Sequence, residues 1–450
     1  MAKFNSKLFN AEAFGQYVKT VPNVKKNELA KSKAVGSNQQ ARDALKNQTG
    51  SLYARVPYFG RISAATSQNN DGATDITSSG ITTFDQGFIV ASRMDSWTER
   101  SFSKNITAGV DFMSEVANQI ADYKMEVKQT MLLAILKGIF SMTTVGSTVP
   151  IIAAREFISK HTYDISANSD ETGKVGISTL NKSMQTACSD NKSIFKLIIV
   201  HSEVATNLEN LRLMKNLTYT DTEGVTRDLS IGTWNGRTVL IDDNMPTEDI
   251  ASSAGVYTVT IGGTLASGDK ITVADTTVTL DSTSAASPTA AANAVYTALG
   301  TMTEYTLAKN AGVLTFTEKS GYYNTGKPSA SITSTAGTVT VATTTEPVIA
   351  YTKYTSYVLG ENSIILDDIG DSNPYAMSRD ERKNGGEDTL YVRDRFICGA
   401  EGLSFEKPVS ITASASNSDL ETGTNWAVIN DGATSIPHKA IPILRIISRG

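Results

Sequence analysis

The strongest helical pattern in the chain lies at residues 111–139. Steps of three and four residues place its apolar side chains on one stripe of a helix. The stripe consists of Met113, Val116, Ile120, Tyr123, Val127, Met131, Ala134 and Ile135. At about 1.5 Å per residue, such a helix extends roughly 45 Å, which is long for a compact domain. We expect it to begin after an Asp111 cap and to end at Gly138 and the segment 143–146.

An extended segment, residues 52–105, precedes this helix. Strand-forming residues occupy 53–59 and 84–94, and the polar cluster 68–72 with Asp71-Gly72 at its tip separates them. Asp-Gly between two apolar runs favours a hairpin turn. An isolated two-stranded ribbon is only marginally stable in water. We therefore expect this ribbon, like the weakly helical residues 1–51 before it, to lie on another surface.

A mixed pattern of helices and buried strands follows from residue 177. The continuous apolar run 194–200 predicts a central strand that is buried on both faces. Helices are expected at 180–188 and 204–214, and strands at 237–241, 354–359, 363–366, 389–397 and 441–447. Helices that alternate with buried strands indicate a sheet covered by helices, and the fold class is α+β.

Composition changes sharply at residues 252–347, where Thr, Ala, Ser and Gly dominate and charges are few. Strands are expected at 256–261, 270–280, 313–317 and 338–342, with a helix at 285–299. We interpret this segment as an inserted β-rich domain, entered and left at nearby points because the strands around Ile241 and Tyr354 should share one sheet. Its expected core is Val259, Ile261, Ile271, Val273, Val295, Leu299, Leu314 and Phe316.

Charge is unevenly distributed along the 450 residues. The first fifty residues hold nine basic and three acidic side chains, whereas the whole chain has a net charge of -5. The basic segment suits contact with nucleic acid or an acidic partner, and equally a solvated arm that orders on assembly. The acidic remainder argues against broad contact with a phosphate backbone.

Cysteine content and hydropathy indicate in which cellular compartment the protein folds. Two cysteines, Cys188 and Cys398, fit a reducing cytosol and exclude a disulfide framework. The first residues have no signal-peptide pattern, and no apolar run approaches the roughly 20 residues of a membrane helix. We expect neither secretion nor membrane insertion.

The three histidines, His161, His201 and His438, are far apart and form no H-E-x-x-H motif, so we expect no zinc site. His201 follows a buried strand, where a catalytic residue could lie. A helix cap formed by Ser202 explains the same position more simply.

Acidic and glycine-rich turns are the remaining candidates for chemistry. Asp242-Asp243 and Asp367-Asp368 follow strands and could bind Mg²⁺, but turn residues are the better interpretation. The cluster 69–72 lacks the ligand spacing of a calcium loop. Gly262-Gly263 lies between strands and cannot be a phosphate cradle at a helix start. We predict no enzyme activity, no catalytic, cofactor-binding or metal-binding residues, and no cofactor.

The order of these elements resembles the major capsid proteins of tailed bacteriophages, which have the Hong Kong 97-like fold. Short motifs carry the same resemblance. They are Gln48-Thr49-Gly50, Trp97-Thr98-Glu99-Arg100, Gly109-Val110-Asp111-Phe112-Met113, Gly138-Ile139-Phe140, Trp234-Asn235-Gly236-Arg237, Asp242-Asp243-Asn244-Met245-Pro246, Gly386-Glu387-Asp388-Thr389-Leu390 and Ile446-Ile447-Ser448-Arg449-Gly450. The resemblance covers most of the chain outside 252–347, which is not part of the minimal fold.

The resemblance implies a division of the chain. It comprises an N-terminal arm (1–51), an E-loop (52–105), a peripheral domain with the spine helix (106–176), an axial domain (177–251 and 348–384), the inserted domain (252–347) and C-terminal peripheral and axial strands (385–450). It also implies self-assembly into hexamers and pentamers of an icosahedral head, with a scaffolding protein and a portal as partners. Packaged double-stranded DNA would be contacted only non-specifically, and the subunit would assemble in the host cytoplasm and end in the virion.

Two other classes remain open. A tail-tube or other phage structural protein would share the Thr/Ala/Gly-rich β module, but the long helix counts against it. A bacterial surface or adhesion protein could also be built on such a module, but the missing secretion signal counts against that.

The sequence also predicts whether the subunits of a mature particle are covalently cross-linked. Some shells of this type join an E-loop lysine to an asparagine of a neighbour, and residues 56–103 contain no lysine. We therefore expect mature particles, boiled in denaturant with reductant, to migrate as single chains in gel electrophoresis. A ladder of resistant multimers would contradict this prediction.

Overall fold

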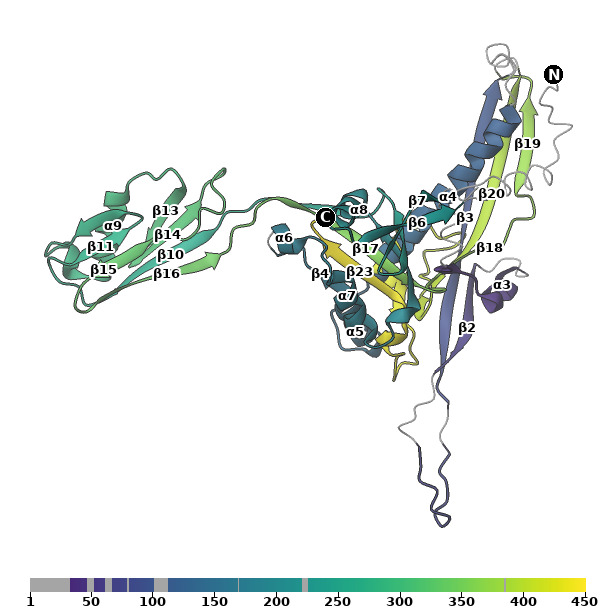
Figure 1. Cartoon of the computed structure of the whole chain (residues 1–450), viewed down its shortest axis with the longest axis horizontal. Helices are drawn as coiled ribbons and strands as arrows, with labels where there is room; N and C mark the ends of the chain where they lie inside the picture. The colour runs from purple at the N-terminus through teal and green to yellow at the C-terminus, as the bar shows by residue number, and fades with distance from the viewer. Residues whose placement is uncertain are drawn as a thin grey trace. The chain divides into compact units, whose positions relative to one another are not determined.

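The computed structural model describes residues 33–46, 52–60, 67–78, 81–100, 112–168, 170–220, 226–383 and 386–450. The chain divides into two compact units (Figure 1). The body comprises Met1–Pro246 and Tyr354–Gly450, and the module comprises Thr247–Lys353. The expected insertion, 252–347, lies inside the module.

One eight-stranded sheet of the body has β5 (Phe195–Val200) at its centre, between β17 (Tyr351–Gly360) and β8 (Arg237–Ile241). Alternate side chains of β5 enter two different cores, Leu197 and Ile199 on one face and Ile198 and Val200 on the other. The predicted central strand is confirmed, and its unbroken apolar run follows from burial on both faces. The remaining strands on the main path are β4 (Thr162–Asp164), β23 (Ile443–Ser448), β7 (Thr226–Trp234) and β6 (Met214–Thr220). The eighth strand, β9 (Thr247–Ile250), pairs with β17 but belongs by sequence to the module.

Helices α5 (Val149–His161), α7 (Thr179–Cys188) and α8 (Ser202–Asn210) belong to this part of the body. The helix predicted at 204–214 is too long, because the chain turns at Arg212 with a positive φ and Met214 starts β6. The predicted cap is also wrong by one residue. The N-cap of α8 is His201, whose Nδ1 accepts a hydrogen bond from the Glu203 backbone N–H at 3.1 Å.

The second eight-stranded sheet of the body contains the ribbon. β2 (Tyr53–Phe59) pairs antiparallel with the first part of β3 (Thr83–Arg100), as the sequence predicted. The strand expected to end at residue 94 continues to Arg100, because residues 89–100 pair with β20 (Glu387–Ala400). The far half of β3 is therefore part of a larger sheet. Its other strands are β1 (Val35–Gly36), β18 (Ile364–Asp368), β19 (Tyr375–Asp380), β21 (Leu403–Phe405) and β22 (Trp426–Val428).

The long helix is α4 (Phe112–Ile139), which runs beside β3 and β20 (Figure 1). Its predicted stripe is confirmed, with four residues buried and two half-buried. These are Ile120, Met131, Ala134 and Ile135, and then Tyr123 and Val127. The Asp111 cap and the side chains of Met113 and Val116 lie outside the described residues.

Gly138 does not end α4, contrary to the prediction. It is helical, and a Cβ there would lie 2.0 Å from the Leu420 carbonyl oxygen and 2.6 Å from Trp426 Nε1. The glycine therefore allows α10 (Asn417–Glu421) to pack directly on the last turn of α4. The helix ends one residue later, at Ile139.

The module contains two antiparallel sheets and one helix. The four-stranded sheet has the order β13 (Tyr305–Asn310), β14 (Val313–Glu318), β10 (Val256–Gly263), β16 (Gly337–Thr345). The three-stranded sheet has the order β12 (Thr276–Thr279), β11 (Lys270–Val273), β15 (Ala330–Thr333), and α9 is Pro288–Leu299. The strand predicted at 270–280 is a hairpin, because Ala274 and Asp275 both have positive φ and reverse the chain.

The predicted core of the module is confirmed. Seven of the eight residues are buried and the eighth, Leu299, packs half-buried against them. Glu318 adds a buried polar anchor, since its carboxylate accepts hydrogen bonds from the Gly255, Asn324 and Gly326 backbone N–H groups and from the Tyr257 hydroxyl. Burial raises the pKa of Glu318, but these donors outweigh it and lower that pKa overall.

The points where the chain leaves and re-enters the body are adjacent. β8 and β17 belong to the same sheet, separated only by β5, as the sequence predicted. The Thr355 backbone N–H donates to the Pro246 carbonyl oxygen at 3.0 Å. Within the module, Ser253 and Val348 exchange two backbone hydrogen bonds. A domain can be inserted at such a site without disturbing the host sheet.

Ile120 tests the buried stripe of α4. Its side chain is 2% exposed. Ile120→Asp would bury an unpaired carboxylate, and we expect it to lower the free energy of unfolding of the body by on the order of 3 kcal/mol. Denaturant unfolding measures this change, with Ile120→Leu as the volume-matched control. Equal stability of the two variants would mean that the stripe does not face a core.

Candidate assembly surfaces

The outer part of the ribbon exposes large apolar side chains. Phe59, Ile76 and Ile81 are 68%, 76% and 59% exposed; Phe59 ends β2, and the two isoleucines lie between β2 and β3. Residues 67–78 contain no strand and are exposed throughout. Single exposed apolar residues are common, but three on one projecting segment mark a contact surface.

The root of the ribbon is held firmly by the body. The buried Gln86 side chain donates from Nε2 to the carbonyl oxygens of Ala400 and Leu403, at 2.8 and 3.1 Å. The Gly87 N–H donates to Ser404 Oγ at 2.9 Å. A Cβ on Gly87 would lie 2.3 Å from the Phe405 carbonyl oxygen, so only glycine allows this approach. The apolar tip is therefore carried on a rigid base.

The tip of the ribbon is an ordered turn. The Asp71 carboxylate accepts hydrogen bonds from the backbone N–H groups of Ala73 and Thr74 and from the Thr74 hydroxyl. These donors lower the pKa of Asp71 to about 2, the Thr74 hydroxyl contributing most. Gln68 and Thr77 exchange two further hydrogen bonds across the loop. Asp71 therefore acts as a turn residue, because both of its carboxylate oxygens accept hydrogen bonds from within the turn.

An ion pair ties α4 to β20. Lys124 Nζ lies 2.7 Å from Asp394 Oδ1 and 2.8 Å from the Tyr375 hydroxyl. Burial lowers the pKa of Lys124, but the Asp394 carboxylate and the Tyr375 hydroxyl outweigh it and raise that pKa. The preceding residue of α4, Tyr123, packs edge-on against Trp97 of β3 with ring centroids 5.2 Å apart. These contacts join α4 to both β20 and β3.

Residues 33–46, the described end of the predicted N-terminal arm, lie on the body of the same chain. β1 pairs parallel with β18, and α3 (Gln39–Lys46) buries Ala41 and Leu45. Arg42 of α3 forms a two-pronged ion pair with Asp367 and donates to the Asp368 carbonyl oxygen at 3.2 Å. The expectation that the whole arm needs another subunit is therefore wrong for residues 33–46, and residues 1–32 lie outside the described residues.

The structure brings together two histidines that sequence reasoning treated as unrelated. His161 Nδ1 lies 2.6 Å from the Ile443 carbonyl oxygen and therefore donates to it, which leaves Nε2 to accept from His438 Nδ1 at 3.2 Å. Burial lowers the pKa of His161 to about 4, so the ring is neutral at pH 7. The pair acts as a buried structural contact between α5 and the C-terminal segment. No motif could reveal it, because its members are 277 residues apart.

The candidate carboxylates also have structural partners. Asp242 is buried and accepts hydrogen bonds from the Gln129 side chain and the Asn244 N–H. Asp243 lies 4.0 Å from His201 Nε2 at the surface. The Asp367 carboxylate binds Arg42, as described above, and Asp368 Oδ1 accepts a hydrogen bond from the Gly370 N–H at 2.9 Å. Both residues end β18, so the prediction that they follow the strand as turn residues is wrong. Among the described residues, no three His, Cys, Asp or Glu side chains are grouped to hold a metal ion.

The last candidates for chemistry that the sequence offered are the two cysteines and the pair Gly262-Gly263. Both cysteines are buried and free, and burial raises the pKa of Cys188 to about 11 and that of Cys398 to about 12. Such thiols are poor nucleophiles at neutral pH. Gly262 and Gly263 end β10, and the next element along the chain is the strand β11, so no helix start follows them.

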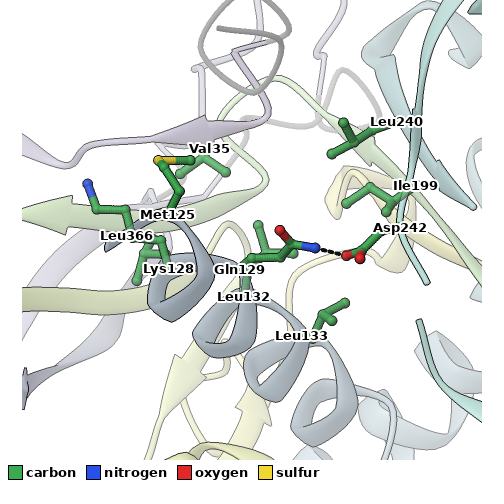
Figure 2. A pocket seen from close by; sticks show the side chains of 10 residues that line it. All are labelled: Val35, Met125, Lys128, Gln129, Leu132, Leu133, Ile199, Leu240, Asp242 and Leu366. Atoms are coloured by element: carbon green, nitrogen blue, oxygen red, sulfur yellow. Dashed lines mark hydrogen bonds between the residues drawn. The ribbon is translucent and has the colours of Figure 1, made fainter. Parts of the chain in front are cut away.

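An apolar cavity of about 170 Å³ lies between α4 and the two body sheets (Figure 2). Ten residues line it: Val35, Met125, Lys128, Gln129, Leu132, Leu133, Ile199, Leu240, Asp242 and Leu366. Two of its polar side chains, Gln129 and Asp242, hydrogen-bond to each other (Figure 2). The cavity therefore lacks the set of convergent polar groups that orients a ligand in a binding site.

None of the helices in the described part of the chain is long and apolar enough to cross a membrane.

Comparison with known proteins gives matches only among solved structures. No family model and no curated protein matches the chain. The capsid asymmetric unit of cyanophage Pam1 is 11% identical, with coverage of 91% of this chain and 88% of that chain and a TM-score of 0.42. The capsid of Ralstonia phage GP4 is 9% identical, with coverage of 100% and 95% and a TM-score of 0.42. The acid-stable capsid of Helicobacter pylori bacteriophage KHP30 is 10% identical, with coverage of 89% and 84% and a TM-score of 0.40. Because TM-scores below 0.5 do not establish a shared fold, we base the proposed function on the elements of this chain.

The exposed isoleucines of the ribbon can be tested directly. Replacing both Ile76 and Ile81 with Ser should leave the unfolding of the body unchanged, since neither side chain belongs to a core. Self-association measured by analytical ultracentrifugation should weaken by about tenfold or more, because each burial contributes on the order of 1.5 kcal/mol.

The control is Val409→Ser, which removes an apolar side chain that is 93% exposed and lies outside residues 52–105. If the control and the ribbon variant associate equally well, the ribbon is not a contact surface.

Proposed function

We propose that this chain is the major capsid protein of a tailed bacteriophage, a non-enzymatic subunit of the icosahedral head shell with the Hong Kong 97-like fold. The observation that carries the proposal is the ribbon, which is fixed at its root by Gln86 and Gly87 but leaves Phe59, Ile76 and Ile81 in solvent. A subunit gains from such an element only when a neighbour covers it. A repeating contact of this kind closes into a shell when the symmetry of the subunits allows it.

The elements of the body fit the parts of that fold in chain order. Residues 1–51 would be the N-terminal arm and 52–105 the E-loop, which contains β2 and β3. Residues 106–176 would form the peripheral domain with α4 as its spine helix. The axial domain would comprise 177–251 and 348–384, interrupted by the inserted domain at 252–347. Residues 385–450 would return as strands shared by the peripheral and axial domains.

The ribbon and its base suggest how copies hold together. The E-loop of one subunit lies across its neighbour and buries Phe59, Ile76 and Ile81. Obligate interfaces of this kind bury about 2,000–5,000 Å². A rigid base lowers the entropy lost on binding, because the root of the ribbon is already ordered in the free subunit.

The role as a capsid subunit also implies the partners of this chain. Copies of the chain form hexamers and pentamers, guided by a scaffolding protein and a portal. The packaged double-stranded DNA is contacted only non-specifically, since the chain has a net charge of -5 and its basic excess lies in the first fifty residues. The subunit assembles in the host cytoplasm and ends in the virion, with no membrane involved.

Electron microscopy and sedimentation test this proposal. The concentrated protein, expressed with the scaffolding protein of the same phage, should give closed particles in negative stain and species far larger than a monomer in sedimentation. The Ile120→Asp variant, whose body is destabilised, serves as the control for non-specific aggregation. A persistent monomer under all such conditions would overturn the proposal.

A further inference from the structure

The four-stranded sheet of the module has one unprotected edge. Its edge strands are β13 and β16, and within the described residues no strand pairs with the outer side of β16. β16 has nine residues, Gly337–Thr345, and the whole segment 328–345 has no charged side chain. The opposite edge, β13, contains Lys309. Natural sheets usually protect long edges with charges, proline or a covering element.

The backbone groups that face this edge follow from the pairing on the other side of β16. The Thr264 N–H donates to the Ala336 carbonyl oxygen, and the Ile261 N–H donates to the Gly312 carbonyl oxygen. In an antiparallel sheet, successive residues direct their backbone groups to opposite sides. The even-numbered residues of β16 at 338, 340 and 342 therefore bond to β10. Those of Val339, Val341 and Thr343 point to the open edge.

The side chains of β16 show the same one-sided arrangement. Val339 and Val341 pack on the module core but stay only half-buried, whereas Thr338, Thr340 and Ala342 are exposed on the other face. An edge strand with an apolar face that is not fully covered and a row of free backbone groups is a template for another strand.

We propose that β16 pairs antiparallel with β16 of a second copy of this chain, so that the two module sheets join across a twofold axis. The strand is complementary to itself. With the axis at Thr340, Val339 meets Val341 on the core-facing side and Thr338 meets Ala342 on the outer side. Thr340 meets its own counterpart, and Thr–Thr pairs are favourable across strands. No like charges oppose one another at any position of the pair.

The second copy as partner rests on the proposed function. In an icosahedral shell, subunits of neighbouring capsomers are related by twofold or nearly twofold axes, and a twofold contact must use the same patch on both partners. A self-complementary edge meets that requirement. The inserted domain then becomes a clasp between capsomers, and each contact adds to the stability of the shell through repetition.

A disulfide across the axis tests the pairing. In the assembled full-length chain, Thr340→Cys places two thiols in a non-hydrogen-bonded pair, where Cα atoms lie about 4.5 Å apart, within the range for a disulfide. The chain's own Cys188 and Cys398 are buried and should not react. Thr306→Cys, an exposed position on the opposite edge of the same sheet, is the matched control.

Gentle oxidation of purified particles should convert most Thr340→Cys chains to dimers on a non-reducing gel, and Thr306→Cys chains should stay monomeric. Intact shells with monomeric Thr340→Cys chains, or with equal dimer from both variants, would overturn the clasp and leave the proposed function standing. Failure of the unmodified protein to form any particle would overturn the proposed function, and the clasp with it. As a second variant, Thr340→Lys places two like charges across the axis and should lower the denaturant concentration at which shells dissociate. Shells assembled from a mixture of Thr340→Lys and Thr340→Glu chains should dissociate at the original denaturant concentration again.

Discussion

The antiparallel pairing of β3 with β20 connects the ribbon to the rest of the body. Residues 89–100 of β3 lie along 387–398 of β20, while residues 83–89 pair with β2. One strand therefore belongs both to the core sheet and to the projecting ribbon. Because Gln86 and Gly87 are fixed at the crossing point by β21 and the segment around it, the exposed apolar tip is held out by a base that resists bending. The position of α4 depends on β20, the partner of β3, because Lys124 of α4 binds Asp394 of β20.

This arrangement explains why stability and assembly can be separated in this chain. The body has its own cores around β5, α4 and α3, and the module has a separate core. The elements that we assign to assembly, the ribbon tip and the edge of β16, contribute little to those cores. Their apolar or unpaired groups gain free energy only in contact with other copies. Many weak, repeated contacts can then stabilise a shell without making the free subunit insoluble.

Sequence patterns predicted the elements whose buried residues follow a regular spacing or form a continuous apolar run. The stripe on α4, the apolar run of β5 and the core of the module follow directly from periodicity, and Val259 and Phe316 are buried as expected. The strands β6, β7, β13, β15 and β19 were missed, because polar or short strands give little periodic signal and form through their partners. Gly138 was misjudged because only the approach of Leu420 explains it. The His161–His438 contact and the free edge of β16 depend on topology, which a local pattern does not contain.

Hydrogen–deuterium exchange at the ribbon tip tests the central claim, that neighbouring copies cover the tip on assembly. Residues 67–78 form no strand in the subunit, so amides there that lie outside the Asp71 turn, such as those of Asp75 and Ile76, should exchange rapidly. In purified particles, the same amides should exchange much more slowly, while amides of β14, buried within the module sheet, serve as the internal reference and should change little. Equal, rapid exchange of the Asp75 and Ile76 amides in subunits and particles would contradict the account.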